Sequence, residues 1–187
     1  MLTQIVSTQM NNSESQFQML EANLAGLSAR VPDLPITGML LCRLILHLGR
    51  EMSAMFEHQI RPFGLAEAEF RVLTTLFSQP DGVAHPGDLC VRALQSPANM
   101  SRISDALVSR DLITRVLSVH DRRRMVLRIT EQGEELVRRL LPKLSAPLRE
   151  VLREFPESEQ QQMIGWLKRL GMKLGEASSH EMPERAV

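Results

Sequence analysis

Arginine side chains are concentrated in the middle of the 187-residue chain, although the chain as a whole carries no net charge. Residues 85–130 contain eight arginines, four aspartates and no lysine, which gives this segment a net charge of +4. The planar guanidinium group forms paired hydrogen bonds with phosphate oxygens and base edges. Three arginines, Arg122, Arg123 and Arg124, follow Asp121, which can fix the arginine that projects outward. These residues favour binding to a phosphate backbone.

A small, polar helix face lies upstream of these arginines. Ser96 and Pro97 are typical of a helix start, because serine caps free amides and the missing N–H of proline costs nothing in the first turn. Helical spacing predicts that Met100, Ile103 and Leu107 are buried. The residues predicted on the opposite face are small or polar, and they are Ala98, Ser101, Arg102, Asp105 and Ser109.

This outer face fits the DNA major groove, because a helix approaches the floor of the groove only where its side chains lack bulk. Arg102 can reach a guanine edge or a phosphate, and Asn99 can pair with adenine. The predicted DNA contacts of the helix are Ser96, Ala98, Asn99, Ser101 and Arg102. Those of the loop are Asp121, Arg122, Arg123 and Arg124, on the flanking backbone or in a narrow minor groove.

Each feature alone is more often solvated surface. A serine-rich helix face usually meets only water, and three arginines in a loop are usually a solvated turn. The occurrence of both in this order favours DNA binding over a protein-interaction module, since a helical domain that binds only a protein partner has no need for such a loop.

The elements that must position these residues follow from the spacing of apolar residues. The period changes from about 3.6 to 2 after the small-faced helix, which predicts an antiparallel hairpin. The predicted order begins with a polar mobile arm (1–13), helices at 17–27, 39–60 and 70–77, and a short helix from Pro86. A helix at 97–111 and strands at 113–119 and 125–130 follow. The chain then forms a helix at 131–155, bent at Pro142 and Pro147, and a last helix from Ser158, which begins with a capping box to Gln161. We therefore predict a mainly α fold with a small β-hairpin wing, a winged helix-turn-helix.

The predicted domain organisation places DNA binding in the middle of the chain. Residues 66–130 form the winged helix-turn-helix domain, and 178–187 form a flexible tail. Dimerisation is assigned to the arm and short helix (1–38) and to the helical regions 39–65 and 131–177, because the apolar stripe of 156–175 has little to pack on within one chain.

Other classes of protein are disfavoured. The longest apolar stretch, Met39 to Leu48, is interrupted by charge and is too short to span a membrane. No secretory signal is recognisable at the N-terminus, so a cytoplasmic location is expected. No nucleophile with a base, paired acids or phosphate-binding glycine loop stands out, so we expect neither an enzyme nor a cofactor.

Two segments carry a resemblance to a known family. SPANMSRISDALVSRDLITR and DRRRMVLRITEQGEEL resemble the MarR family of bacterial regulators, whose wing signature is matched by Asp121, Arg123, Ile129 and Thr130. The resemblance covers about residues 39–175. Within the family, the stretches QMLEANLA and LLCRLILHL look most like multidrug-efflux repressors of the EmrR (MprA) type. The resemblance implies a triangular homodimer that binds a palindromic operator whose half-sites are one helical turn apart. It also implies that hydrophobic or phenolic ligands release the protein from this operator.

The sensing site is less constrained by the sequence. Eleven methionines, six phenylalanines and no tyrosine suggest an adaptable apolar interior, and His47, Met52 and Phe70 are the candidate ligand-binding residues. Cys42 suggests redox sensing instead, as in peroxide-sensing family members. Its expected place in an apolar stripe would leave the thiol inert, and such sensors use tyrosines that this chain lacks. No Cys or His cluster has zinc-ligand spacing, so no metal is predicted.

Overall fold

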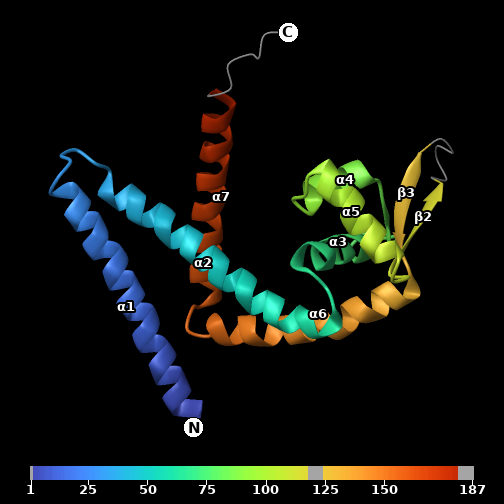
Figure 1. Ribbon diagram of the computed structural model, residues 1–187, viewed down its shortest axis with the longest axis horizontal. Coiled ribbons are helices and arrows are strands. Elements are labelled where there is room, and N and C mark those ends of the chain that lie inside the picture. The colour runs from blue at the N-terminus through green and yellow to red at the C-terminus, as the bar shows by residue number, and fades with distance from the viewer. Residues whose placement is uncertain (1, 118–123, 181–187) are drawn as a thin grey trace.

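The computed structural model describes residues 2–117 and 124–180, with side chains from residue 14 to residue 177 outside that gap (Figure 1). Helices dominate the described part, and three short strands form a single sheet. The elements are α1 (Leu2–Ser28), α2 (Ile36–Ile60), the 3₁₀ helix η1 (Arg61–Phe63), α3 (Glu67–Phe77), β1 (Val83–Ala84), α4 (Pro86–Arg92), α5 (Pro97–Val108), β2 (Ile113–Leu117), β3 (Met125–Ile129), α6 (Glu131–Val151) and α7 (Glu157–His180). No helix in this part of the chain is both long and apolar enough to cross a membrane.

The predicted hairpin is present, and it belongs to a three-stranded antiparallel sheet of order β1-β3-β2. Val116 of β2 pairs with Val126 of β3, and Ala84 of β1 pairs with Leu127 on the other side of β3. The prediction of only two strands was wrong, because the two residues of β1 are too few to show an alternating pattern. The third strand ties the wing to the segment between α3 and α4.

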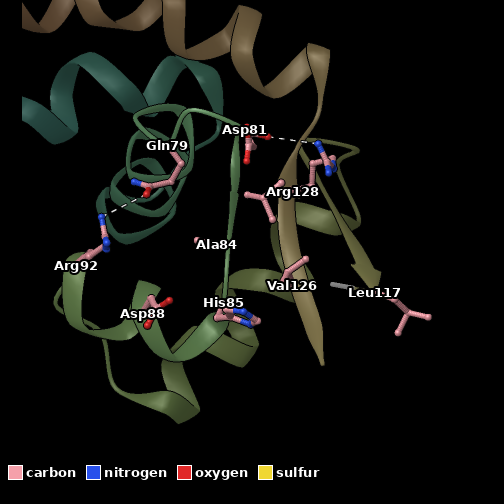
Figure 2. Close-up of a pocket in the computed structure, with 10 residues that line it drawn as sticks. Gln79, Asp81, Ala84, His85, Asp88, Arg92, Leu117, Val126 and Arg128 are labelled. Carbon is pink, nitrogen blue, oxygen red and sulfur yellow. Dashed lines mark hydrogen bonds between the residues drawn. The ribbon is translucent and has the colours of Figure 1, made fainter. Parts of the chain in front are cut away.

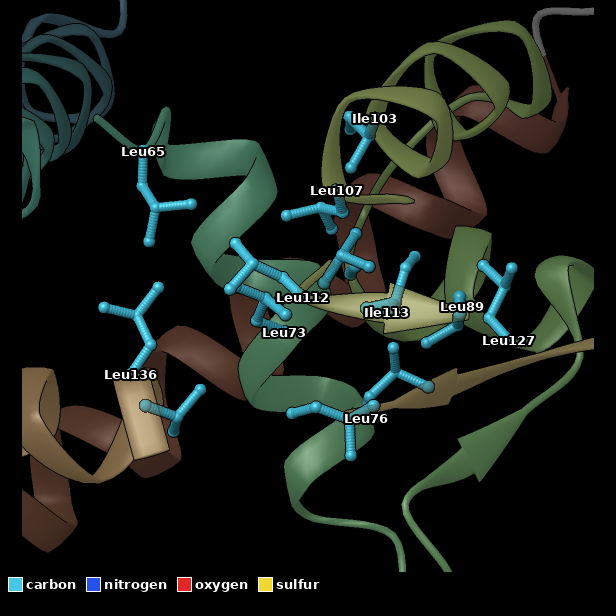
Figure 3. Packing of buried hydrophobic residues seen from close by; sticks show 14 of the residues in the cluster. Leu65, Leu73, Leu76, Leu89, Ile103, Leu107, Leu112, Ile113, Leu127 and Leu136 are labelled. Carbon is cyan, nitrogen blue, oxygen red and sulfur yellow. The ribbon is translucent and has the colours of Figure 1, made fainter. Parts of the chain in front are cut away.

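One apolar core fixes the helix-turn-helix to the sheet and to α6 (Figure 3). Met100, Ile103 and Leu107 of α5 are 2%, 1% and 0% exposed, so the predicted buried side of this helix is confirmed. Complete burial of such a side chain contributes about 1.5–3 kcal/mol. The remaining fully buried members of the core include Ile60, Val72, Leu73, Leu76, Leu89, Ile113, Leu127 and Leu140.

Two helix starts are capped as the sequence predicts. Ser96 accepts a hydrogen bond from the backbone N–H of Asn99 at 3.2 Å, and Thr130 accepts one from Gly133 at 3.0 Å. Gly133 occupies the position where a capping box would have glutamate. A Cβ atom there would lie 2.2 Å from the carbonyl oxygen of Leu112, so the close approach of α6 to the sheet requires glycine.

Several predicted helix boundaries were wrong. The backbone is helical from Leu2, so the helix predicted at 17–27 begins much earlier, and α2 begins at Ile36 rather than Met39. Helix α5 ends at Val108 and α6 at Val151, and α6 contains both Pro142 and Pro147. Helix α7 begins at Glu157, so Ser158 lies inside the helix and does not cap it.

Helix α7 rises from the end of α6, outside the lobe formed by α3, α4, α5 and the sheet (Figure 1). Its large apolar side chains remain exposed, with Trp166 at 61%, Leu167 at 55% and Leu174 at 59%. Apolar residues of α1 and α2 are also exposed, among them Met19 and Leu46. The helices outside the winged lobe therefore present exposed apolar surface.

Candidate nucleic-acid interface

Helices α4 and α5 form a helix-turn-helix, joined by the turn of residues 93–96 and supported from behind by α3. Leu94 in this turn has a φ of +54°, in the left-handed region that favours glycine. Its side chain is exposed, so the turn is set by the backbone and by packing of the flanking residues Ala93 and Leu89 in the core.

The outer face of α5 is exposed as predicted. All five residues expected there, Ala98, Ser101, Arg102, Asp105 and Ser109, are solvent-accessible, and Ser96 at the cap is exposed as well. Asn99 is half-buried at the edge of this face. The only long side chain on this face is Arg102, so the helix presents a slender surface with one projecting cation.

Hydrogen bonds link the polar side chains at the start of α5. Arg102 Nη2 donates to Asn99 Oδ1 at 2.8 Å, and Asn99 Nδ2 donates to Gln95 Oε1. Gln95 was not among the predicted site residues. It lies in the turn one residue before the Ser96 cap, and this position next to the predicted helix start is the signal that could have identified it.

A second unpredicted residue, Arg115, joins the wing to α5. Its guanidinium on β2 forms an ion pair with Asp105 on the outer face of α5. Both side chains are exposed, so the arginine lies on the surface at the junction of α5 and β2. Sequence spacing gave no sign of this pair, since it depends on the packing of β2 against α5.

The tip of the wing is described only in part. Asp121, Arg122 and Arg123 lie outside the described residues, whereas Arg124 is exposed just before β3.

A pocket of about 540 Å³ opens between the sheet and α4 (Figure 2). Arg128 on one side donates to the carbonyl oxygen of Asp81 at 3.3 Å.

One arginine of the positive segment faces away from this surface. Arg110 donates to the carbonyl oxygens of Gly64 at 2.6 Å and Phe63 at 2.8 Å, and its Nη1 lies 3.8 Å from Glu69. The two carbonyl groups follow α2, so Arg110 connects the end of α5 to the segment just after α2. The net charge of the segment therefore overstates the charge available to DNA.

The three candidate ligand residues do not share one pocket. His47 lines a groove of about 670 Å³ between α1 and α2, and its ring meets that of Phe17 edge-on at a centroid distance of 5.7 Å. Met52 and Phe70 are not part of the groove lining. Met52 is exposed further along α2, and Phe70 packs against the core. The groove is lined by Gln16, Met19, Leu20, Asn23, Arg43, Leu46, His47 and Arg50.

The expected burial of Cys42 was wrong, because its side chain is exposed on α2. The apolar stripe of α2 is broad, and in one chain α1 and α3 cover only part of it. Cys90 is half-buried against the core. Among the described residues, no three His, Cys, Asp or Glu side chains are grouped as metal ligands would be.

Comparison with known proteins gives consistent matches. A model of the MarR family matches residues 63–124, which span α3 to the wing. The chain is 31% identical over 150 residues to the transcriptional repressor MprA of Escherichia coli, covering 80% of this chain and 85% of that protein. The MarR family regulator AbsC of Streptomyces coelicolor has a similar fold, with a TM-score of 0.70 at 23% identity over 77% of this chain and 98% of AbsC. BpsR of Bordetella bronchiseptica, whose DNA binding is regulated by 6-hydroxynicotinic acid, matches with a TM-score of 0.61 at 20% identity over 69% of this chain and 91% of BpsR.

Proposed function

The chain belongs to the MarR family of transcriptional regulators, and we propose that it acts as a homodimeric repressor that binds a palindromic operator and releases it when a small hydrophobic compound binds. The observation that carries the proposal is the exposed, slender face of α5 beside an arginine-bearing wing. A helix of this kind enters the major groove while a wing contacts the flanking duplex. Because its proposed target is chromosomal DNA, we place the protein in the cytoplasm.

The proposed DNA contacts are divided between helix and wing. Ser96 can donate its hydroxyl proton to a phosphate while its oxygen caps α5, and Ala98 and Ser101 leave room for close approach. Asn99 and Arg102 lie nearest the base edges in this arrangement. Asp121, Arg122, Arg123 and Arg124 would contact the backbone beside the half-site.

Dimerisation is proposed through the helices outside the winged lobe. The exposed Trp166, Leu167 and Leu174 of α7 form the kind of apolar surface that monomeric proteins seldom leave uncovered. Two-fold pairing would place two copies of α5 one helical turn of DNA apart, about 10 bp.

The ligand site is proposed in the groove between α1 and α2. Met19, Leu20 and Leu46 supply apolar surface, and His47 supplies a polar contact, as small-molecule sites require. The regulation of BpsR by a small aromatic acid supports ligand control in this chain. The resemblance to efflux repressors of the EmrR type supports a multidrug efflux pump as the regulated target.

A mobility shift assay tests DNA binding and ligand release together. The wild-type protein is titrated against the DNA upstream of its own gene, with and without lipophilic phenols. We expect a specific complex that the active compounds dissociate, and the same compounds should raise the melting temperature of the free protein. Compounds that stabilise the protein without weakening the complex would contradict the proposed switch.

The salt dependence of binding tests the wing. The logarithm of the affinity falls linearly with the logarithm of salt concentration, with a slope set by the number of neutralised phosphates. Arg123→Ala should weaken binding and reduce this slope by about one unit. Arg153→Ala is the matched control, because it removes an exposed arginine paired with Glu150 near the end of α6. An equal slope for wild type and Arg123→Ala would exclude the wing from the interface.

A further inference from the structure

A chain of hydrogen bonds runs along the exposed start of α5 and has a fixed polarity. Gln95 Nε2 donates to the backbone carbonyl of Ala93 in the turn, at 3.1 Å. Gln95 Oε1 then accepts from Asn99 Nδ2, and Asn99 Oδ1 accepts from Arg102 Nη2 at 2.8 Å. The chain begins at the backbone of the helix-turn-helix and ends at a guanidinium group.

We infer that Arg102 contacts a guanine in the operator half-site, and that Asn99 and Gln95 are positioning residues that hold its guanidinium, not residues that recognise adenine. The inference rests on the proposed function, because it names the base that the proposed DNA-binding surface recognises. It also assigns a role to Gln95, which sequence analysis did not identify.

The count of donors and acceptors supports guanine. A guanidinium has five N–H donors and no acceptor, and Arg102 uses one donor on Asn99. Its remaining donors match the O6 and N7 acceptors that guanine presents in the major groove. Recognition of adenine requires an amide with a free oxygen and a free N–H on one edge. The Asn99 amide already donates one N–H to Gln95 and accepts from Arg102, so these two partners and not a base set the orientation of its plane.

The geometry at the start of α5 explains why this series of hydrogen bonds forms. Asn99 and Arg102, three positions apart in α5, lie next to one another on the helix surface. Gln95 lies in the turn just before α5, where its side chain accepts a hydrogen bond from Asn99. The cap from Ser96 to the N–H of Asn99 fixes the first turn at the same place. Holding the arginine in advance reduces the conformational entropy that it loses on binding DNA. This saving is realised only where the guanidinium meets its guanine, so the positioning residues should affect binding to the guanine-containing operator more than binding to DNA that lacks this guanine.

The test begins with selection of an operator from a random DNA pool by the wild-type protein. Each guanine and adenine of the selected half-site is then replaced in turn by its 7-deaza analogue, which lacks the N7 acceptor. We expect one guanine position where the replacement weakens wild-type binding about tenfold or more. Arg102→Ala should bind the normal and modified operators equally at that position.

Substitution of Asn99 and Gln95 distinguishes an asparagine that positions Arg102 from an asparagine that recognises adenine. Asn99→Ala and Gln95→Ala should each reduce the discrimination at that same guanine, while leaving sensitivity to 7-deazaadenine unchanged. Asn99→Asp keeps an acceptor for Arg102 and should retain most of the guanine discrimination. Gln79→Ala is the matched control, because it removes another glutamine that accepts a hydrogen bond from an arginine, Arg92, at 3.3 Å, outside the recognition helix. Circular dichroism melting of each variant verifies that the fold is intact.

Two results would overturn the inference while leaving the proposed function in place. One is full guanine discrimination by Arg102→Ala or by Asn99→Ala, and the other is loss of sensitivity to 7-deazaadenine in Asn99→Ala. Failure of the wild-type protein to enrich any DNA sequence would instead contradict the proposed function, and the inference with it.

Discussion

At the scale of single residues, side chains of one type serve different ends in this protein. Arg102 and Arg124 are exposed at the proposed DNA surface, whereas Arg110 is committed to backbone carbonyls that follow α2. In the sequence these arginines differ in nothing that separates the two roles. The partners of Arg110 lie 46 and 47 residues away in the chain, so residue spacing does not reveal them.

Arg110→Ala should lower the free energy of unfolding by about 1.5–3 kcal/mol, since it removes two charge-assisted hydrogen bonds between α5 and the end of α2. Urea unfolding followed by circular dichroism measures the change. Arg153→Ala, which breaks only an exposed ion pair with Glu150, should cost less than about 1 kcal/mol. Equal unfolding midpoints for the two variants would contradict a structural role for Arg110.

Leu94→Gly should be more stable than Leu94→Ala by about 1 kcal/mol. The φ of +54° strains any residue with a Cβ atom, and the exposed Leu94 side chain contributes little packing that either substitution would lose. Thermal unfolding of the two variants measures the difference directly. A more stable alanine variant would show that this backbone is not left-handed in solution.

At the scale of elements, strongly periodic segments were predictable and short ones were not. The sides of α5, its cap at Ser96 and both wing strands followed from residue spacing and start signals. The strand β1 did not, because its pairing with β3 depends on tertiary contact between two residues and a distant segment. The helical backbone before residue 14 was missed because residues 11–16 are all polar and interrupt the helical spacing of the apolar side chains.

Gly133→Ala should destabilise the protein by about 2–4 kcal/mol, because the new methyl group would meet the carbonyl oxygen of Leu112 at 2.2 Å and Ile129 Cγ1 at 2.9 Å. The backbone of α6 or of the sheet would have to shift to admit it. Thermal denaturation tests this expectation.

Gly87→Ala in α4 is the matched control for this substitution. A Cβ atom there meets nothing within 4 Å, and alanine favours the helix by up to about 1 kcal/mol relative to glycine. Equal melting temperatures for Gly133→Ala and the wild-type protein would contradict the close approach of α6 to the sheet.

At the scale of the whole molecule, the sequence predicted which helices carry apolar stripes but not which stripes one chain can cover. The stripe of α3 is buried against the sheet and α6, whereas that of α7 is exposed. The same limit explains why the prediction that Cys42 is buried was wrong. An apolar stripe on α2 indicates burial only where a neighbouring element packs over that position. The apolar surfaces of α2 and α7 that one chain leaves exposed are therefore candidates for the proposed dimer interface.

Leu167→Glu should shift the protein from dimer to monomer at micromolar concentration, because pairing would bury an uncompensated carboxylate in the proposed interface. Operator affinity should then fall by about two orders of magnitude or more, since the second half-site is no longer bound as part of one linked complex. Sedimentation equilibrium measures the mass, and a mobility shift assay measures the affinity.

Gln161→Glu is the charge-matched control, because helical spacing places this exposed residue on the opposite side of α7. A wild-type chain that sediments as a monomer, or a Leu167→Glu variant that remains dimeric, would place the two-fold contact elsewhere. In the latter case the apolar surface of α7 would need another partner, because exposed side chains of this size in register along a helix are seldom left in water.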